Sequence, residues 1–293
     1  MTVDLERASS FMAMQARVLD RLRYELLVGT GDCEATLCAV DAYRNPDGGY
    51  GRGLEPDLRS TESQPAGALH AFEVLEEVQP AGTRQAAALC DWLSTVSDSD
   101  GGIPFALPVQ NAAGCAPFWA SADTTSSLHM TAAVAGAAHR VATYEAAIAG
   151  HAWLARSTRF CMDAIAQMEE PGHALELLFS IRFLDAVHDT EPRAPDELRR
   201  LGEFLPSDGG LHVAGGLEDE MVRPLDFAPR AGPASRLWLE AVISRELDRL
   251  DALQKDDGGW PCDFALYSPA AALEWRGYLT VAALTTIHNH RNL

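Results

Sequence analysis

The chain has 293 residues, of which 47% are hydrophobic, and its 42 acidic against 23 basic residues give a formal charge of −19. Phosphate groups are bound by clustered Lys and Arg, so this acidic balance excludes nucleic acid and an anionic membrane surface from the expected partners. Hydrophobic content this high argues against disorder, and a chain of this length buries enough apolar surface to fold without cross-links.

The sequence also argues against export and membrane insertion. The first residues, Met1 to Arg7, lack the basic-then-apolar order of a signal peptide. No apolar run reaches the roughly 18 residues of a membrane span. The cysteines show no CxxC pair or framework spacing. We therefore expect a cytoplasmic protein whose cysteines are reduced thiols in the role of small buried residues: Cys33, Cys38, Cys90, Cys115, Cys161 and Cys262.

Helical apolar spacing, in which hydrophobic residues recur at intervals of three and four, accounts for most of the chain. Ala68, Leu69, Phe72 and Leu75 follow it, for example, and no segment alternates with the two-residue period of a strand. Alanine-rich stretches such as 131–138 predict close packing of small helix faces. The sequence predicts about twelve helices, at roughly 3–28, 32–45, 63–78, 82–97, 123–138, 141–156, 158–169, 172–188, 194–205, 232–246, 247–255 and 271–289.

A repeated tripeptide organises these helices. Asp-Gly-Gly begins at Asp47, Asp100, Asp208 and Asp257, with gaps of 53, 108 and 49 residues. The gaps indicate a unit of about 50 residues, with one copy between 100 and 208 that lacks its glycine pair. In each unit a helix precedes the turn, and a loop and a second helix follow it. The sequence therefore predicts an all-α fold, an (α/α)6 toroid of six helical hairpins forming a single domain over residues 1–293.

The last repeat carries the pattern Gln-x-x-x-Gly-x-Trp, in Gln254, Gly258 and Trp260. This pattern resembles the repeat motif of squalene and hopene cyclases, and the match is partial in the other units. The resemblance implies the α/α toroid that these cyclases share with protein prenyltransferase β subunits. In this motif the glycine makes a turn, the glutamine satisfies backbone groups at a helix end, and the aromatic ring packs under the next unit.

A second resemblance concerns chemistry. Class II cyclases carry an Asp-rich DxDD motif followed by Thr, at the place where a loop enters an inner helix. The segment Ser121-Ala122-Asp123-Thr124-Thr125-Ser126 lies at the matching place. The resemblance puts Asp123 in the position of the proton-donating Asp and Thr125 in that of the Thr, although Ala and Thr replace the other acids. An Asp before a helix is also a common helix cap, and both roles stay open.

The loop from Gly49 to Pro65 combines glycines with closely spaced charges. Gly51 and Gly53 allow positive φ or a close approach of the backbone, and Glu55 and Asp57 lie among arginines. Two carboxylates beside a guanidinium can hold different pKa values, which is the usual basis of acid–base catalysis. The alternative is a salt-bridged connecting loop with Asp57 in a turn.

Loops that follow the other Asp-Gly-Gly turns converge on the same mouth if the repeats close into a ring. Aromatic walls with a few acids suit a cationic intermediate or a sugar ring cut by paired carboxylates. Beyond Asp123, Asp57 and Glu55, the predicted site contains the acids Asp226, Asp263 and Glu274, the rings of Trp119, Phe227, Tyr267 and Trp275, and the arginines Arg59, Arg230 and Arg276.

No cofactor or metal is expected. The prenyltransferase branch binds zinc through Asp-x-Cys and a later His, whereas this chain has Cys262-Asp263 in the opposite order and His288 far downstream. No DDxxD, P-loop or Gly-x-Ser-x-Gly motif occurs. The other histidines, His70 among them, are interpreted as structural residues.

The leading hypothesis is an enzyme of isomerase or lyase type that cyclises or isomerises a small, largely apolar molecule by acid–base catalysis. Asp123 would donate the proton, with Asp57 and Glu55 as partner or base. Two alternatives stay open: a carbohydrate-active hydrolase or lyase that uses paired carboxylates, and a non-catalytic binding scaffold.

Overall fold

The computed structural model describes residues 3–120, 123–206 and 209–291. Within these residues the chain is mostly helical, with fourteen α-helices, one 3-10 helix and one two-stranded sheet, so the predicted all-α class is confirmed. No helix in the described part combines the length and the apolar character needed to cross a membrane.

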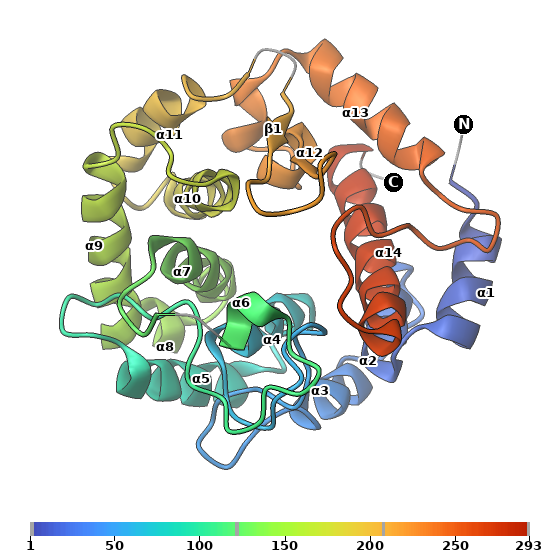
Figure 1. The fold of residues 1–293 in the computed structure, drawn as a ribbon, viewed down its shortest axis with the longest axis horizontal. Coiled ribbons are helices and arrows are strands. Elements are labelled where there is room, and N and C mark those ends of the chain that lie inside the picture. The colour runs from blue at the N-terminus through green and yellow to red at the C-terminus, as the bar shows by residue number, and fades with distance from the viewer. Residues whose placement is uncertain (1–2, 121–122, 207–208, 292–293) are drawn as a thin grey trace.

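The helices are arranged in a ring that follows the order of the chain (Figure 1). On its outside lie α1 (Leu5–Gln15), α3 (Cys33–Asp41), α5 (Thr83–Val96), α9 (Ala152–Ala166), α11 (Ala194–Gly202) and α13 (Glu240–Ala252). Nearer its centre lie α4 (Pro65–Glu77), α7 (Leu128–Ala142), α10 (Ala174–Val187), α12 (Pro224–Phe227) and α14 (Pro269–Arg291). The helix α2 (Val18–Leu27) follows α1 and contacts α14.

The remaining elements are short. They are the helices α6 (Pro117–Ala120) and α8 (Ala146–Ala149), the 3-10 helix η1 (Ala234–Leu237), and the strands β1 (Leu211–His212) and β2 (Met221–Val222). The two strands pair antiparallel, with Leu211 opposite Val222 and His212 opposite Met221. This two-residue pairing is too short to leave an alternating pattern in the sequence, which is why no strand was expected.

Several predicted helices have different bounds. The expected helix over 3–28 is divided at Ala16 and Arg17, because the Arg17 side chain pairs with Asp20 and donates to the carbonyl oxygens of Gly53 and Leu54. The helix expected from 123 begins at Leu128, where Ser127 caps it. The expected break near 157 lies instead at Gly150 and His151, where the apolar spacing continues but the backbone turns. The expected 232–246 segment divides into η1 and α13.

The Asp-Gly-Gly turns share one local structure. In three of them the Asp carboxylate accepts a hydrogen bond from the backbone N–H of the second Gly, at 2.9–3.1 Å. The first Gly has a φ of +95 or +96°, a conformation that favours glycine. In the remaining turn, Asp208 lies outside the described residues, and Gly209 also has a positive φ. The turn that the sequence predicts is therefore confirmed at residues 47, 100 and 257.

Each of these turns packs against the next outer helix along the ring. A Cβ on Gly48 would lie 2.9 Å from the Ala88 carbonyl oxygen in α5, and one on Gly101 would lie 2.7 Å from that of Arg156 in α9. Gly258 meets the Arg7 carbonyl oxygen of α1 in the same way, at 2.1 Å. The second glycine of each turn faces an aromatic ring four residues further along the same helix: Trp92, Phe160 and Phe11. The turn after α13 thus contacts α1 as the earlier turns contact α5 and α9.

The two ends of the chain are joined by Gln254. Its amide accepts a hydrogen bond from the Asp4 N–H and donates to the carbonyl oxygens of Asp4 and Gly258. Trp260 is buried in a cluster with Phe11 and Met12 of α1, and its Nε1 donates to Leu250 O. The roles that the sequence predicts for the glutamine and the aromatic residue are therefore confirmed.

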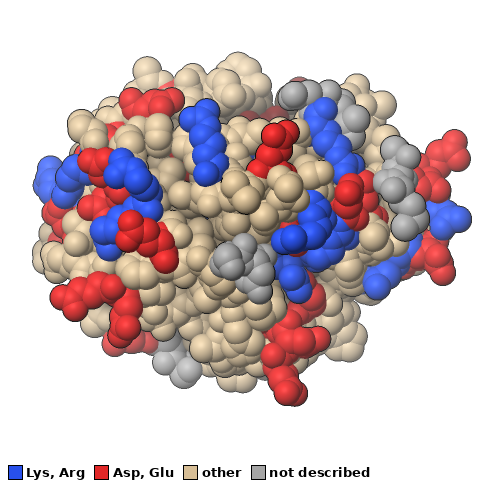
Figure 2. Space-filling view, turned by 90° about the horizontal axis from the view of Figure 1, so that it is seen from above, with Lys and Arg blue, Asp and Glu red and all other residues tan. Residues whose placement is uncertain are grey.

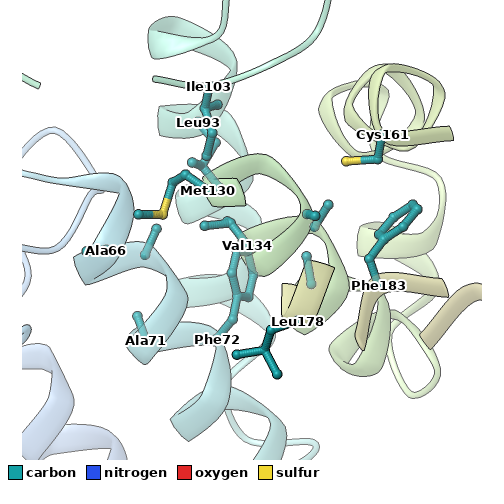
Figure 3. Packing of buried hydrophobic residues seen from close by; sticks show 14 of the residues in the cluster. Ala66, Ala71, Phe72, Leu93, Ile103, Met130, Val134, Cys161, Leu178 and Phe183 are labelled. Atoms are coloured by element: carbon teal, nitrogen blue, oxygen red, sulfur yellow. The ribbon is translucent and has the colours of Figure 1, made fainter. Parts of the chain in front are cut away.

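The larger core lies between the inner helices and the outer helices around them. In Figure 3, Met130 and Val134 of α7 pack between α4, which carries Ala66 and Phe72, and α10, which carries Leu178. Gly136 brings α7 so close to α10 that a Cβ there would lie 3.3 Å from the Phe183 Cα. The alanine-rich segment of α7 is thus packed through its small faces, as the sequence predicts.

Charged side chains are distributed over the surface, and acidic and basic residues are interspersed on the side seen in Figure 2. All six cysteines are free, which agrees with the expected reduced thiols. Only Cys90 and Cys161 are buried, whereas Cys38 is exposed, so the burial expected for all six is wrong for most of them.

We predict that Gly258→Ala destabilises the protein more than Gly215→Ala does. Both glycines have positive φ, which costs an alanine about 1–2 kcal/mol, but nothing lies within 4 Å of a Cβ on Gly215. The contact with Arg7 should add about 1–3 kcal/mol to the cost at Gly258. Unfolding in guanidinium chloride measures the difference, and equal losses for the two variants would contradict the close packing of this turn.

Candidate functional site

The loop that follows the first Asp-Gly-Gly turn carries two buried carboxylates, one of which contacts α4. Gly51 is required there because a Cβ would lie 2.0 Å from the Glu62 carbonyl oxygen, and Arg52 and Gly53 both have positive φ. Leu54 and Leu58 are buried and anchor the loop, and Glu55 and Asp57 between them are only 7% and 4% exposed. The glycines therefore have the roles that the sequence predicts.

Asp57 is held by groups from distant parts of the chain. Its Oδ2 accepts a hydrogen bond of 2.6 Å from Trp275 Nε1 on α14, and its backbone oxygen accepts one from Ala116 N beside α6. Its buried Oδ1 has no partner with normal hydrogen-bond geometry among the described residues. The Glu55 carboxylate accepts a hydrogen bond from the Asp57 backbone N–H at 3.1 Å. The predicted pair of acids is thus brought together.

His70 connects Glu55 to a second carboxylate. Its Nε2 lies 2.8 Å from Glu55 Oε2 and its Nδ1 lies 3.0 Å from Glu73 Oε2, one turn further along α4. Tyr278 of α14 donates to both oxygens of Glu73, at 3.0 and 3.1 Å. The result is a continuous hydrogen-bonded chain from the loop of Asp57 to the middle of α14.

The protonation of this chain follows from its surroundings. Burial disfavours the charged form of His70, but the adjacent carboxylates of Glu73 and Glu55 outweigh it and raise the pKa of His70 to about 9. Burial raises the pKa of Asp57 above its usual value, the Trp275 hydrogen bond opposes this change, and the negative charge of Glu55 adds to it. Asp57 thus holds its proton more tightly than an ordinary aspartic acid does. His70, in contrast, is an imidazolium at neutral pH.

Aromatic rings continue from Asp57 around the inside of the ring of helices. Trp275 makes edge contacts with His70, Phe264 and Tyr278, at centroid distances of 5.1–6.0 Å. A second series of ring contacts connects separate loops and inner helices. It runs from Tyr267 through Phe118, Trp119, Phe105 and His129 to Phe179 on α10.

The other predicted residues do not all lie at Asp57. Arg59 and Glu274 form an ion pair with each other beside the Asp57 loop. Trp119 is buried and stacks on Phe105 at 4.6 Å, whereas Tyr267 is half exposed. Arg276 is separate from this group, because it pairs with Asp257 and donates to Trp260 O.

The remaining predicted residues have partners other than Asp57 or lie at the surface. Asp226 accepts a hydrogen bond from the Arg223 backbone N–H at 2.6 Å, and burial raises its pKa. Arg230 pairs with Glu76 of α4 at 2.8 Å, and Asp263 is exposed. Phe227 is completely buried against Trp238. Asp226 and Arg230 are therefore close to inner helices without touching Asp57.

Asp123 has a different environment from Asp57. It is exposed, and its Oδ1 accepts a hydrogen bond from the Thr125 N–H at 2.7 Å, which forms a local turn. The N-cap of α7 is Ser127, so Asp123 lies before the helix and does not cap it. Ser121 and Ala122 of the predicted motif lie outside the described residues.

Four residues of this region were not among the predicted site residues: His70, Glu73, Phe264 and Tyr278. A signal for three of them exists in the spacing, because His70 and Glu73 are three residues apart on one helix, and Trp275 and Tyr278 are three apart on another. Among the described residues, no group of three or more His, Cys, Asp or Glu side chains is placed to hold a metal ion.

Comparisons with known proteins identify a structure of similar fold but do not indicate an activity. No protein-family model matches the chain, and no curated protein matches it either. The chain is similar to a solved structure of a protein from Actinoplanes, with a TM-score of 0.58 over 97% of this chain and 98% of that one. The two are 14% identical, so the likeness shows the fold alone.

The raised pKa of His70 predicts a pH-dependent stability. Protonation of His70 is favoured in the folded state relative to the unfolded pKa of 6.5, so its contribution is complete below about pH 6.5 and is lost as the pH rises through about 9. The free energy of unfolding should fall by about 3 kcal/mol across this window. The His70→Gln variant should lack this part of the decrease in chemical unfolding measured at pH 6, 7.5 and 9.5. Parallel curves for the two proteins would contradict the assignment.

Proposed function

We propose that this chain is an enzyme that isomerises or cyclises a small, largely apolar molecule, with Asp57 as the acid that donates the first proton. The observation that carries the proposal is the combination at Asp57: a buried carboxyl with a raised pKa, in contact with Trp275, whose Oδ1 lacks a hydrogen bond of normal geometry although the Tyr267 backbone N–H lies close to the carboxyl. A general acid needs to retain its proton until the substrate is bound and to offer that proton from an oxygen that the substrate can reach.

The surroundings of Asp57 suit the intermediate that such a proton transfer creates. Protonation of a carbon–carbon double bond leaves a cation, and the faces of aromatic rings stabilise cations. Trp275, which is hydrogen-bonded to Asp57, is in contact with the rings of Phe264 and Tyr278. The cation completes the reaction by losing a proton from carbon, and the Asp57 carboxylate can take that proton and so become the acid again. Glu55 stays a neighbour of this centre, since it accepts a hydrogen bond from the Asp57 backbone N–H and is bound to His70.

The proposal includes the (α/α)6 toroid as a single domain and revises the role of Asp123. Repeated packing of the Asp-Gly-Gly turns on the next outer helix, including the contact between Gly258 and α1, supports a closed ring of hairpins. The exposure of Asp123 favours Asp57 as the acid. Because the Asp57 carboxyl is buried, the substrate reaches it only when the neighbouring segment with Tyr267 moves.

The two alternatives find less support. A hydrolase with paired carboxylates needs a second carboxylate that is free to act as base or nucleophile. Both oxygens of Glu55 are engaged, one by His70 and one by the Asp57 N–H, so the pair offers one free acid. A non-catalytic binding scaffold remains the expected interpretation if no substrate is turned over in the experiment below.

Asp57→Asn should abolish proton-initiated turnover, whereas Asp123→Asn should retain it. The protein is incubated in D2O with a panel of isoprenoid alkenes and alcohols of 10 to 20 carbons, and gas chromatography with mass spectrometry detects products that have gained a deuterium on carbon. Loss of the acid should reduce incorporation by about a hundredfold or more. Turnover by the Asp57 variant at the wild-type rate, or its loss in the Asp123 variant alone, would overturn the assignment.

Trp275→Phe should shift the pH profile of this activity. The Trp275 hydrogen bond favours the carboxylate and lowers the pKa of Asp57, so its removal raises that pKa further. An acid acts only when protonated, and the high-pH limb of the rate profile should therefore move to higher pH. The measurement is the deuterium incorporation rate between pH 4 and 9, and a limb that stays in place would show that Asp57 does not set it.

A further inference from the structure

One inward-facing arginine lacks the acidic partner that its neighbours have. Arg140 of α7 pairs with Asp185 at 2.9 Å, and Arg230 pairs with Glu76 at 2.8 Å. Arg182 of α10, which is close enough to Arg140 to feel its charge, has no ion pair with any carboxylate in the described part of the chain. Its Nε donates to the backbone oxygen of Asp226 at 2.6 Å. A guanidinium has five N–H donors, so this bond fixes its orientation and leaves its two terminal nitrogens available.

In the environment of Arg182, the absence of an acidic partner destabilises the charged guanidinium. Burial and the charge of Arg140 lower the pKa of Arg182, although Asp226, Tyr278 and Glu73 nearby favour its charged form. A buried charge without a paired group is destabilising, and an anion supplied from outside would remove that cost. Arg182 is nevertheless partly exposed, so its guanidinium is not sealed from solvent.

Aromatic rings lead directly to this guanidinium. The Arg182 Cζ lies 5.6 Å from the centroid of Phe179, one turn earlier on α10. His129 stacks on Phe179 at 5.0 Å, and Phe105 contacts His129 at 5.3 Å. Burial lowers the pKa of His129 to about 4, so this imidazole is neutral and behaves as part of the apolar surface.

We propose that Arg182 binds the carboxylate of an amphiphilic ligand whose apolar chain lies against Phe179, His129 and Phe105. A single negative charge fits better than a phosphate or diphosphate, because Arg140, the arginine whose charge acts on Arg182, already pairs with Asp185. A planar carboxylate also matches the fork of a guanidinium. The ligand site is inferred from these contacts, and only its interpretation as the substrate site rests on the proposed function.

Calorimetric titration of the full chain with three probes of equal chain length tests the site. The probes are octanoate, octyl phosphate and the neutral 1-octanol. The wild-type protein should bind octanoate at least about tenfold more tightly than octanol, because a charge-assisted hydrogen bond contributes at least that factor. Equal affinities for the two, or no binding of either, would overturn the proposal. Octyl phosphate binding more tightly than octanoate would overturn the assignment to a carboxylate.

Arg182→Gln should weaken octanoate binding about tenfold or more and leave octanol binding unchanged. The matched control is Arg200→Gln, which removes an arginine that also donates to backbone oxygens, of Ile165 and Met168, but on the outer helix α11. Unchanged octanoate binding by the Arg182 variant would contradict the site. If that variant folds poorly by circular dichroism, Arg182→Lys keeps the charge without the fork and should bind octanoate several-fold more weakly than the wild type. These binding measurements are independent of the deuterium assay, so either proposal can fail alone.

Discussion

The ring depends on how a two-glycine turn packs against the helix that follows it. The first glycine takes a positive φ and lies against a backbone carbonyl oxygen, and the second lies against an aromatic ring one helical turn further on. Side chains at either position would separate the turn from that helix. Because the turn after α13 meets Arg7 and Phe11 in the same way, one local constraint, repeated along the chain, also connects its two ends.

The same constraint determines where chemistry is located. Each turn follows an outer helix, and the chain then crosses to an inner helix. The loop that makes this crossing therefore lies at the ends of the helices. The crossing loop between α3 and α4 carries Glu55 and Asp57 and is held by Arg17, which donates to the backbone of Gly53 and Leu54. The second turn of α4 and that of α14 then bring His70 to Glu55 and Trp275 to Asp57.

Charges in the interior are distributed unevenly. Near Asp57 a histidine between two carboxylates carries a positive charge, and burial raises the pKa of Asp57 itself. Further along the inner helices most arginines are paired with acids, and Arg182 is the exception discussed above. Each region has its own series of aromatic rings, around Trp275 at the acid and from Tyr267 to Phe179 at the arginine.

The sequence by itself determined the repeat, the helical class and the Asp-Gly-Gly turns, because periodic apolar spacing and glycine pairs act through neighbours in the chain. It also identified Glu55 and Asp57 from their unusual loop. It did not identify His70, Glu73 or Tyr278 as their partners, and it placed the acid at Asp123 by motif position. Only the tertiary structure identified these partners and showed that Asp57 is buried whereas Asp123 is exposed. Burial and the charges that other helices bring within a few ångströms are also what determine the pKa of a carboxyl. That is why Asp57, buried against Trp275 from the other end of the chain, differs so much from the exposed Asp123.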